Sequence, residues 1–202
     1  ARTMLGKLEK LRISPKHNEL PGNWTSKHLI QLCLFLVDCH NKTAPVVPTG
    51  IPIIRTTNIR NRAYRNKDQK FITEATYQYW SRRCPPQSGD IIFTREAPVG
   101  EALIIPENTT WCLGQRTMLI KPALDFISNK YLLIALTEQS LLAIALEKHA
   151  VGSTVKHLRV GDVEKLNIPI PPLAEQHRIV AKVDELLALC DQLKSSLQQA
   201  QE

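Results

Sequence analysis

The sequence has no apolar run long enough to cross a membrane, because no stretch of about 18 consecutive apolar residues occurs in it. Its first residues, Ala1 to Gly6, contain no apolar segment of the kind that directs export. A membrane span and a secreted product are therefore not expected, and we predict a cytoplasmic protein. Position 1 is not Met, so we expect a processed or engineered start, or a piece of a longer protein.

Cysteine is scarce and irregularly placed. The five cysteines form no Cys-x-x-Cys pair, and the six histidines are equally dispersed. An odd number at irregular spacing is typical of reduced thiols, not of a disulfide framework or a zinc site. We therefore expect no metal centre in this chain.

The common enzyme signatures are also missing. The sequence contains no phosphate-binding Gly-x-x-x-x-Gly-Lys loop, no Gly-x-Gly-x-x-Gly turn, no Gly-x-Ser-x-Gly elbow and no His-Glu-x-x-His motif. Asp68-Gln-Lys70 has the acid-x-Lys form of some metal-dependent nucleases, and Asp38 is an upstream acid. That tripeptide is frequent by chance and lies in a basic segment, so a nuclease is a weak alternative.

What the chain does have is positive charge in one part of it. Its 202 residues suffice for one core and an extension, and the formal net charge is +7. Residues 1–172 hold 23 bases and 14 acids (+9), whereas residues 173–202 hold 3 bases and 5 acids (−2). A basic globular part suits a polyanion such as DNA, although moderately basic domains that bind nothing charged are common.

The patterning predicts an α+β fold, with a compact β-rich domain that contains a few helices and is followed by one long helix. Residues 1–20 read as a leader or peripheral arm, 21–172 as the globular domain and 173–202 as the long helix. Residues 28–37 are a strand or a short buried helix, and Thr73 is expected to cap a short helix after Phe71. Strands are expected at 51–55, 91–95, 101–105 and 117–121, helices at 129–136 and 141–147, and an extended exit at 166–172.

The final segment carries the most regular pattern in the chain. Apolar or small residues recur in alternating steps of four and three, the spacing of a coiled-coil seam, and Pro171-Pro172 begins the helix. We interpret this helix as a connector or measuring rod cut from a longer protein, and a C-terminal helix folded back on its own domain is the alternative. The seam residues are Ile179, Val183, Leu186, Cys190, Leu193, Leu197 and Ala200.

The strongest clue to a ligand is a basic segment at residues 55–70, which holds four Arg and three Asn. Arg and Lys contact phosphates, Arg pairs with guanine and Asn pairs with adenine. A solvated loop that serves solubility is the alternative. The candidate DNA-binding residues here are Arg55, Asn58, Arg60, Arg62, Arg65, Lys67 and Lys70.

Other basic residues follow strand and turn signals. Arg95 and Arg116 either project toward DNA or pair with Glu96 or Glu101 nearby. A second basic element, with Thr154, Lys156 and His157, can approach a phosphate backbone or be an ordinary turn. The aromatic residues Tyr77, Tyr79 and Trp80 are expected in the core.

Six stretches in series resemble the DNA specificity (S) subunit of type I restriction–modification systems, over residues 20–200. Each stretch alone is weak evidence for the family, but six of them in the same order are specific to it. They are Gly50-Ile-Pro-Ile-Ile-Arg-Thr-Thr-Asn-Ile59, Gly89-Asp-Ile-Ile-Phe-Thr-Arg-Glu-Ala-Pro-Val-Gly100, Cys112-Leu-Gly-Gln-Arg116, Gly152-Ser-Thr-Val-Lys-His-Leu-Arg-Val-Gly-Asp162, Ile168-Pro-Ile-Pro-Pro-Leu-Ala-Glu-Gln176 and Val183-Asp-Glu-Leu-Leu-Ala-Leu-Cys-Asp191.

The resemblance implies a target-recognition domain and its conserved helix, which together make half of such a subunit. The family's S subunit has two of these units, and its two helices pair antiparallel to space two half-sites. The resemblance also implies a non-catalytic chain that docks modification (methyltransferase) subunits and, through the complex, a restriction subunit. S-adenosylmethionine, ATP and Mg then belong to those partners, and the form of the helix favours the N-terminal half.

We therefore expect a sequence-reading module for double-stranded DNA. Phosphates would be held by Lys67, Lys70, Arg82 and Lys156, and the candidates for reading base edges are Arg55, Asn58, Arg60, Arg62, Arg95 and Arg116. Motifs shared by subunits with different targets are structural or contact phosphates, which places Arg55, Arg95 and Lys156 closer to framework than to base reading. The variable stretch 60–88, with Arg60 and Arg62, is then the better place to seek sequence readout. The free helix should pair two copies into a dimer. A non-catalytic interaction or inhibitor protein that works through its helix is the other alternative.

Overall fold

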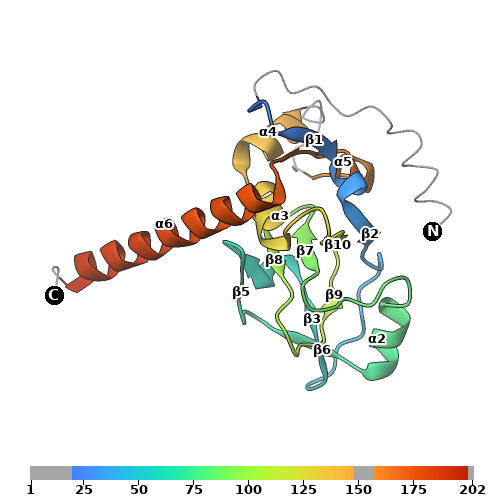
Figure 1. Cartoon of the computed structure of the whole chain (residues 1–202). Coiled ribbons are helices and arrows are strands. Elements are labelled where there is room, and N and C mark those ends of the chain that lie inside the picture. The colour runs from blue at the N-terminus through green and yellow to red at the C-terminus, as the bar shows by residue number, and fades with distance from the viewer. Residues whose placement is uncertain (1–19, 148–156, 200–202) are drawn as a thin grey trace.

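The computed structural model describes residues 20–147 and 157–199, and these form the predicted α+β fold (Figure 1). Strands and short helices make a body from which one long helix extends. No helix in the described part of the chain is both long and apolar enough to span a bilayer.

A four-stranded antiparallel sheet is the centre of the body. Its order is β2-β10-β7-β8, with β2 at Cys33–Asp38, β7 at Ile91–Thr94, β8 at Ala102–Ile104 and β10 at Thr117–Pro122. Neighbouring residues of a strand point to opposite faces, so Phe93 lies in one buried cluster and Ile92 in a second. All four β7 residues are buried, which makes the sheet a wall between two cores.

A smaller three-stranded sheet, β6-β3-β9, continues the body. It consists of β3 at Ile51–Ile54, β6 at Lys70–Ile72 and β9 at Cys112–Leu113. The single turn η2 (Thr56–Asn58) leads from β3 into the hairpin β4 (Ile59–Arg60) and β5 (Ala63–Tyr64). Helix α2 (Glu74–Trp80) follows β6, and the Thr73 side chain accepts a hydrogen bond from the Thr76 amide at 3.2 Å, which confirms the predicted cap.

Helices cover the face of the central sheet on which Phe93 lies. They are α3 (Asn129–Leu136), which Ser128 caps as predicted, α4 (Gln139–Glu147) and α5 (Val160–Glu164). The apolar run from 28 to 37 takes both of the forms that its sequence allows, a 3-10 turn η1 (Leu29–Leu32) followed by β2. Strand β1 (Thr25–His28) pairs antiparallel with β11 (Asn167–Ile170), and this joins the two ends of the body.

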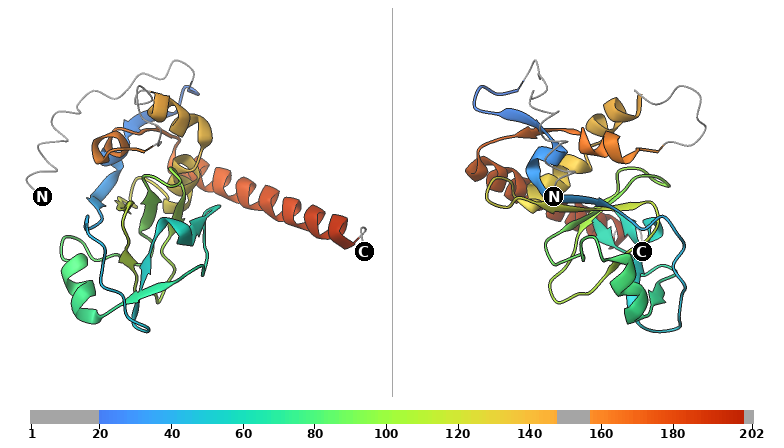
Figure 2. Two further views of the ribbon diagram at one scale, coloured as in Figure 1. Left: turned by 180° about the vertical axis from the view of Figure 1, so that it is seen from behind. Right: turned by 90° about the vertical axis from the view of Figure 1, so that its right-hand side faces the viewer.

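The long helix α6 (Leu173–Gln199) begins where Pro171-Pro172 predicted it. Its first two turns belong to the body, since Gln176 and Val180 are buried. The Gln176 side chain accepts a hydrogen bond from the Ser128 amide at 2.8 Å and donates one to the Pro171 carbonyl at 3.0 Å. Beyond Val183 the helix projects from the body, as Figure 1 and the left view of Figure 2 show.

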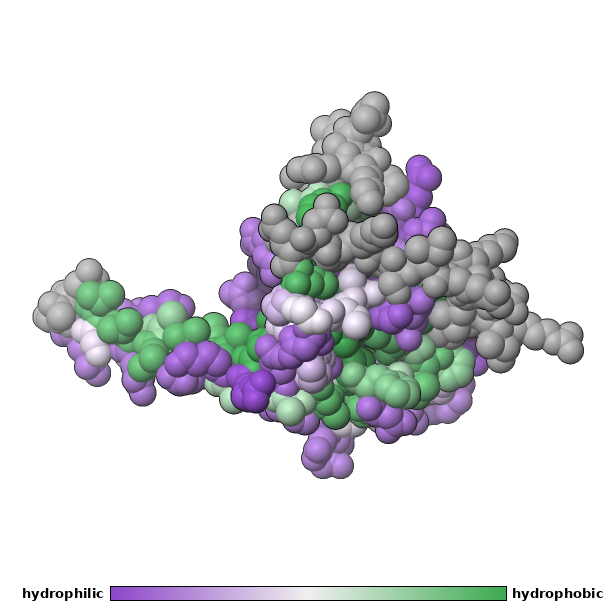
Figure 3. Space-filling view, turned by 45° about the horizontal axis from the view of Figure 1, so that its top comes forward, coloured by the Kyte–Doolittle hydropathy of each residue, from purple (hydrophilic) through white to green (hydrophobic). Residues whose placement is uncertain are grey.

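The projecting part of α6 exposes an apolar stripe. About 17 residues at 1.5 Å each give it a length of about 25 Å. Figure 3 shows hydrophobic side chains along it. The exposed apolar residues of this part include Leu186, Leu193 and Leu197, which are 49%, 65% and 63% exposed. The other predicted seam residues differ in their exposure: Ile179 packs against the core, Val183 is half-buried and Cys190 is exposed. Ala200 lies outside the described residues.

Candidate nucleic-acid interface

The strand register brings several turns to one end of the central sheet. The paired residues Met118 and Asp38, Thr117 and Thr94, and Phe93 and Ala102 all lie at that end. The chain segments that continue from these strands therefore lie side by side. We call this surface the rim and define it as residues 39–42, 61–62, 95–101 and 114–116.

The β4–β5 hairpin joins the rim through its turn. Asn61 and Arg62 have φ angles of 52° and 63°, and two successive positive φ angles are what a type I′ turn requires. The Glu101 carboxylate accepts a hydrogen bond from the Asn61 amide at 2.8 Å. Behind the turn, the Tyr64 ring lies 5.2 Å from the Trp111 ring, so the hairpin is held at both ends.

Most basic residues of the 55–70 segment lie on the surface around this hairpin. Arg65, Lys67 and Lys70 are exposed, and Arg62 is half-buried. Within the described residues none of these four has a carboxylate partner. Arg60 is half-buried and donates to the carbonyls of Thr56 (2.6 Å) and Ile59 (2.5 Å). The segment is thus a source of uncompensated positive charge, as its sequence predicted.

Asn58 corrects one prediction, because it lies inside the protein and does not face a ligand. Its side chain is fully buried, and its carbonyl oxygen accepts from the Arg55 amide at 3.1 Å. Its amide group donates to the carbonyls of Arg65 (3.1 Å) and Lys67 (2.9 Å). The side chain has no group left for an adenine edge, so base contact was the wrong role for it. It organises the basic segment instead.

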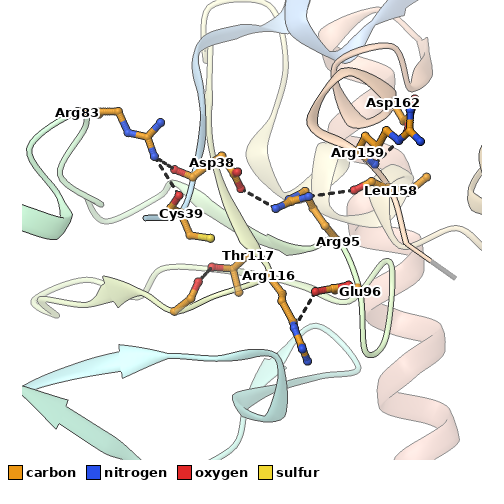
Figure 4. A network of polar contacts seen from close by, with 11 residues as sticks. Asp38, Cys39, Arg83, Arg95, Glu96, Arg116, Thr117, Leu158, Arg159 and Asp162 are labelled. Atoms are coloured by element: carbon orange, nitrogen blue, oxygen red, sulfur yellow. Dashed lines mark hydrogen bonds and ion pairs between the residues drawn. The ribbon is translucent and has the colours of Figure 1, made fainter. Parts of the chain in front are cut away.

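Arg95 is also a framework residue, as its place in a shared motif predicted. Its guanidinium binds the Asp38 carboxylate at 2.9 Å and donates to the Leu158 carbonyl at 3.1 Å (Figure 4). The Arg55 guanidinium is similarly engaged with the Asp68 carbonyl. Both residues tie segments together that are distant in sequence, and this limits their freedom to reach DNA.

Arg116 takes the pairing that the sequence offered as an alternative. It binds the Glu96 carboxylate at 2.7 Å, but its side chain is still 57% exposed. Its φ of 68° closes the turn after β9. Gly114 in the same turn has no room for a side chain, since a Cβ there would lie 2.6 Å from the Ile54 carbonyl oxygen. The glycine of the Cys112–Arg116 motif is therefore required for close packing of β3 and β9.

The second basic element reaches the rim at its end. Residue His157 forms a β-bridge with Glu96, and the Leu158 amide donates to the Arg95 carbonyl at 2.9 Å. The predicted contacts Thr154 and Lys156 lie outside the described residues. Of the predicted contacts in this element, His157 therefore lies at the rim.

Sequence reasoning missed two cations, Lys42 within the rim and Arg83 beside it. Lys42 and Arg83 are exposed cations, and the adjacent bases Arg82-Arg83 directly after α2 were the available signal. Tyr79 corrects the expectation of a core residue, because it is 52% exposed and carries the Arg82 guanidinium 3.9 Å above its ring. Tyr77 and Trp80 do pack against a core cluster, as expected.

The arrangement offers no clear metal-dependent nuclease centre. In residues 20–147 and 157–199, no three His, Cys, Asp or Glu side chains gather into a set that could hold a metal ion. The Asp38 carboxylate is held by Arg95, and the Asp68 backbone is held by Arg55. What the rim can do is present cations and hydrogen-bond donors to a polyanion.

Comparison with known proteins agrees with this chemistry. The family profile of the type I restriction modification DNA specificity domain matches residues 21–201. The chain is 26% identical to the type I restriction enzyme EcoAI specificity subunit of Escherichia coli, over 98% of this chain and 35% of that one. It is 28% identical to the StySPI specificity subunit of Salmonella potsdam, over 74% of this chain and 32% of that one.

Solved structures share the fold. The HsdS subunit from Thermoanaerobacter tengcongensis superposes with a TM-score of 0.61 at 21% identity, covering 96% of this chain and 45% of that one. A chain from a study of assembly and conformational transition of the type I R-M system gives 0.62 at 21% identity, with 96% and 46% coverage. This chain therefore spans about a third of the curated relatives' length and about half that of the solved chains.

The chain belongs to the family of type I restriction modification DNA specificity domains. The curated relatives above are named as specificity subunits of type I restriction enzymes. A domain of this family is described as a DNA specificity domain, and the exposed cations of the rim are suited to a polyanion such as DNA.

Proposed function

We propose that this chain reads one half of a bipartite double-stranded DNA target for a type I restriction–modification enzyme. The observation that carries the proposal is the rim, where the strand register gathers basic turns at one end of a rigid sheet. Functional residues on loops that a rigid scaffold positions are typical of binding proteins. A flat or acidic surface at this end would have supported a different ligand.

The candidate residues divide into two roles. Arg62 lies on the type I′ turn, and Arg60 lies just before it. The carbonyl contacts of Arg60 use its Nη1 alone, so its other guanidinium donors remain for a base edge. Lys67, Lys70 and Arg82 are exposed on the surrounding surface, as suits contacts to phosphates. Phosphate contacts fix the position of the protein, whereas contacts to base edges select the sequence.

The free part of α6 supports antiparallel pairing with a second copy or with the other half of a complete subunit. The seam is self-complementary when the two helices run in opposite directions about a centre between Leu186 and Cys190. Each layer then joins an a position with a d position. The layers are Ile179 with Leu197 of the second copy, Val183 with its Leu193, and Leu186 with its Cys190.

The residues beside this centre support the same register. Leu187 and Leu189 are 43% and 46% exposed, and they flank the seam where the proposed twofold axis passes. The widest apolar part of the helix then lies at the middle of the interface. A C2 interface requires such a self-complementary patch.

The proposal assigns the chemistry to other chains of the complex. The modification subunits would dock on this chain and supply S-adenosylmethionine-dependent methylation, and the restriction subunit would use ATP and Mg. All five cysteines are free, which suits a protein that works in the cytoplasm. A non-catalytic inhibitor that acts through α6 is the second candidate, and the exposed apolar stripe is the observation in its favour.

The test is selection of bound sequences from a randomised duplex pool, with the modification subunits present. We expect enrichment of one short half-site, or of two inverted copies at fixed spacing if two chains pair through α6. Arg60→Ala together with Arg62→Ala should relax the base preference. Recovery of no motif, with tight binding to a protein partner alone, would favour the inhibitor instead.

A further inference from the structure

A hollow of about 350 Å³ opens where the rim segment 39–42 meets the end of α2. Three of its lining residues, Lys42, Arg82 and Arg83, are cations. Within the described residues none of the three has a carboxylate partner. The one acid in the lining, Asp38, already binds Arg95 at 2.9 Å. The hollow is therefore left with uncompensated positive charge.

Two of these cations are held in place by the protein. The Arg83 guanidinium donates to the backbone carbonyls of Asp38 and Cys39, and Figure 4 shows both contacts. The Arg82 guanidinium lies 3.9 Å above the Tyr79 ring and donates to the Tyr79 carbonyl at 2.5 Å. Arg82 uses one nitrogen in this way and keeps its other donors, so it is oriented before a ligand arrives.

One lining residue of the hollow, His40, belongs to an aromatic cluster. The His40 ring meets the Trp80 ring edge-on at 4.6 Å and the Tyr79 ring at 5.5 Å. Partial burial lowers the pKa of His40, and the charges of Arg82, Lys42 and Arg83 lower it further. The three cations of the lining thus lie close enough to His40 to act on it electrostatically.

The hollow and the hairpin lie at opposite edges of the central sheet. Segment 39–42 continues from the edge strand β2, whereas the hairpin turn is fixed by Glu101 next to the other edge strand, β8. Three strand spacings of about 4.8 Å separate these edges by about 14 Å. At about 3.4 Å per base pair, this distance corresponds to about four steps along a duplex.

We propose that this hollow binds a backbone phosphate of DNA, with Lys42 and Arg82 as its ligands, about four base pairs away from the bases read by the hairpin. The inference rests on the proposed function and extends its contact surface to the β2 edge. The phosphate carries no sequence information, so this contact sets the position of the domain along the duplex. Arg83 holds the wall of the hollow through its carbonyl contacts.

The experiment compares the full chain with a Lys42→Gln/Arg82→Gln variant on duplexes that contain the selected half-site. Lys130→Gln/Lys165→Gln is the matched control, since both of these lysines are exposed and lie toward the opposite end of the sheet. Affinity is measured against salt concentration, and then on duplexes with single methylphosphonate linkages, which remove the charge of one phosphate at a time.

We expect the salt slope of the hollow variant to be shallower by about 0.9 for each phosphate that the variant no longer binds, with an unchanged base preference. One methylphosphonate outside the read bases should weaken the wild type about tenfold and leave the variant unaffected. An unchanged slope together with identical methylphosphonate profiles would overturn the inference while the proposed function stands. Loss of sequence preference in the wild type would instead be a failure of the proposed function.

Discussion

The carboxylate of Glu101 accepts a hydrogen bond from the backbone amide of Asn61 at 2.8 Å, although 40 residues separate them. This contact fixes the hairpin turn, the proposed base-reading element, to the rigid edge of the central sheet. A turn held in a fixed position on the sheet edge presents Arg62 in one orientation. Pre-organisation of this kind reduces the conformational entropy that is lost on binding.

Replacement of Glu101 by Ala should therefore loosen the turn and lower both affinity and base discrimination. Loss of one hydrogen bond to a charged acceptor predicts a decrease of about 1–3 kcal/mol in the free energy of binding or of unfolding. Sequence selection and denaturant titration measure the two effects. Glu101→Gln keeps an acceptor and is the control. A fully preserved base preference in Glu101→Ala would show that the turn needs no such support.

Asn58 should behave as a stability residue and not as a base reader. Asn58→Ala leaves three backbone groups without their partner inside the protein, so unfolding should become easier by about 2–3 kcal/mol. Urea titration measures this, and binding at a temperature where the variant stays folded should keep the same base preference. A variant of native stability that has lost a single base preference would restore the base-reading role.

Two ion pairs of the rim should differ in their contribution to stability because their exposure differs. The Asp38 and Arg95 side chains are 25% and 18% exposed, so Asp38→Ala leaves a half-buried guanidinium unpaired and should cost about 1–3 kcal/mol. The Arg116 side chain is 57% exposed, and Arg116→Ala should cost less than about 1 kcal/mol. Parallel chemical denaturation of both variants checks the order, and equal losses would contradict it.

The proposed register of α6 predicts which introduced cysteine can form a disulfide between two copies of the chain. Leu186→Cys places a thiol in the same layer as Cys190 of the second copy, so mild oxidation should give a covalent dimer. Val183→Cys places its thiol in a different layer and should not form a covalent dimer. Efficient oxidation of both cysteine variants would argue for another register.

Disruption of the seam is a second test of the pairing. Leu186→Asp should give a monomer in sedimentation equilibrium, with Gln192→Asp on the polar face as control.

The pKa of His40 offers a test that does not depend on affinity. It should lie below the ordinary value of 6.5 in the free protein, because the ring is partly desolvated and faces Arg82, Lys42 and Arg83. Removal of one positive neighbour favours the protonated ring, so Arg82→Gln should raise the pKa. Binding of DNA should raise it as well if a phosphate enters the hollow. An NMR titration of the ring protons measures all three states.

Helices and strands of this fold could be predicted from the sequence where the determining residues lie within the element itself. Thr73 and Ser128 cap helices through bonds to amides three residues away, and Pro171-Pro172 starts α6 by fixing the backbone of its own turn. The seam of α6 was likewise a matter of spacing within one helix. Such signals need no knowledge of the rest of the chain.

The site was less predictable because it depends on contacts between distant segments. Nothing near Asp38 indicates that it binds Arg95, 57 positions away by residue number. Asn58 had the composition of a base reader, and only its burial reveals a framework role. Tyr79 resembles a core residue in sequence, but the short helix α2 turns it outward. Charge and residue type identified the basic segment, and tertiary packing decided which of its members face outward.

The wall-like central sheet also has a consequence for how the domain can change over time. Its two buried clusters are built from strand residues such as Ile92 and Phe93, whereas Lys42, Arg62 and Arg116 belong to neither. Mutation of these three side chains leaves the interior intact, so a lineage can acquire a new target without first losing a folded protein. The same separation makes the turns at this end of the sheet the natural place to introduce diversity in a library.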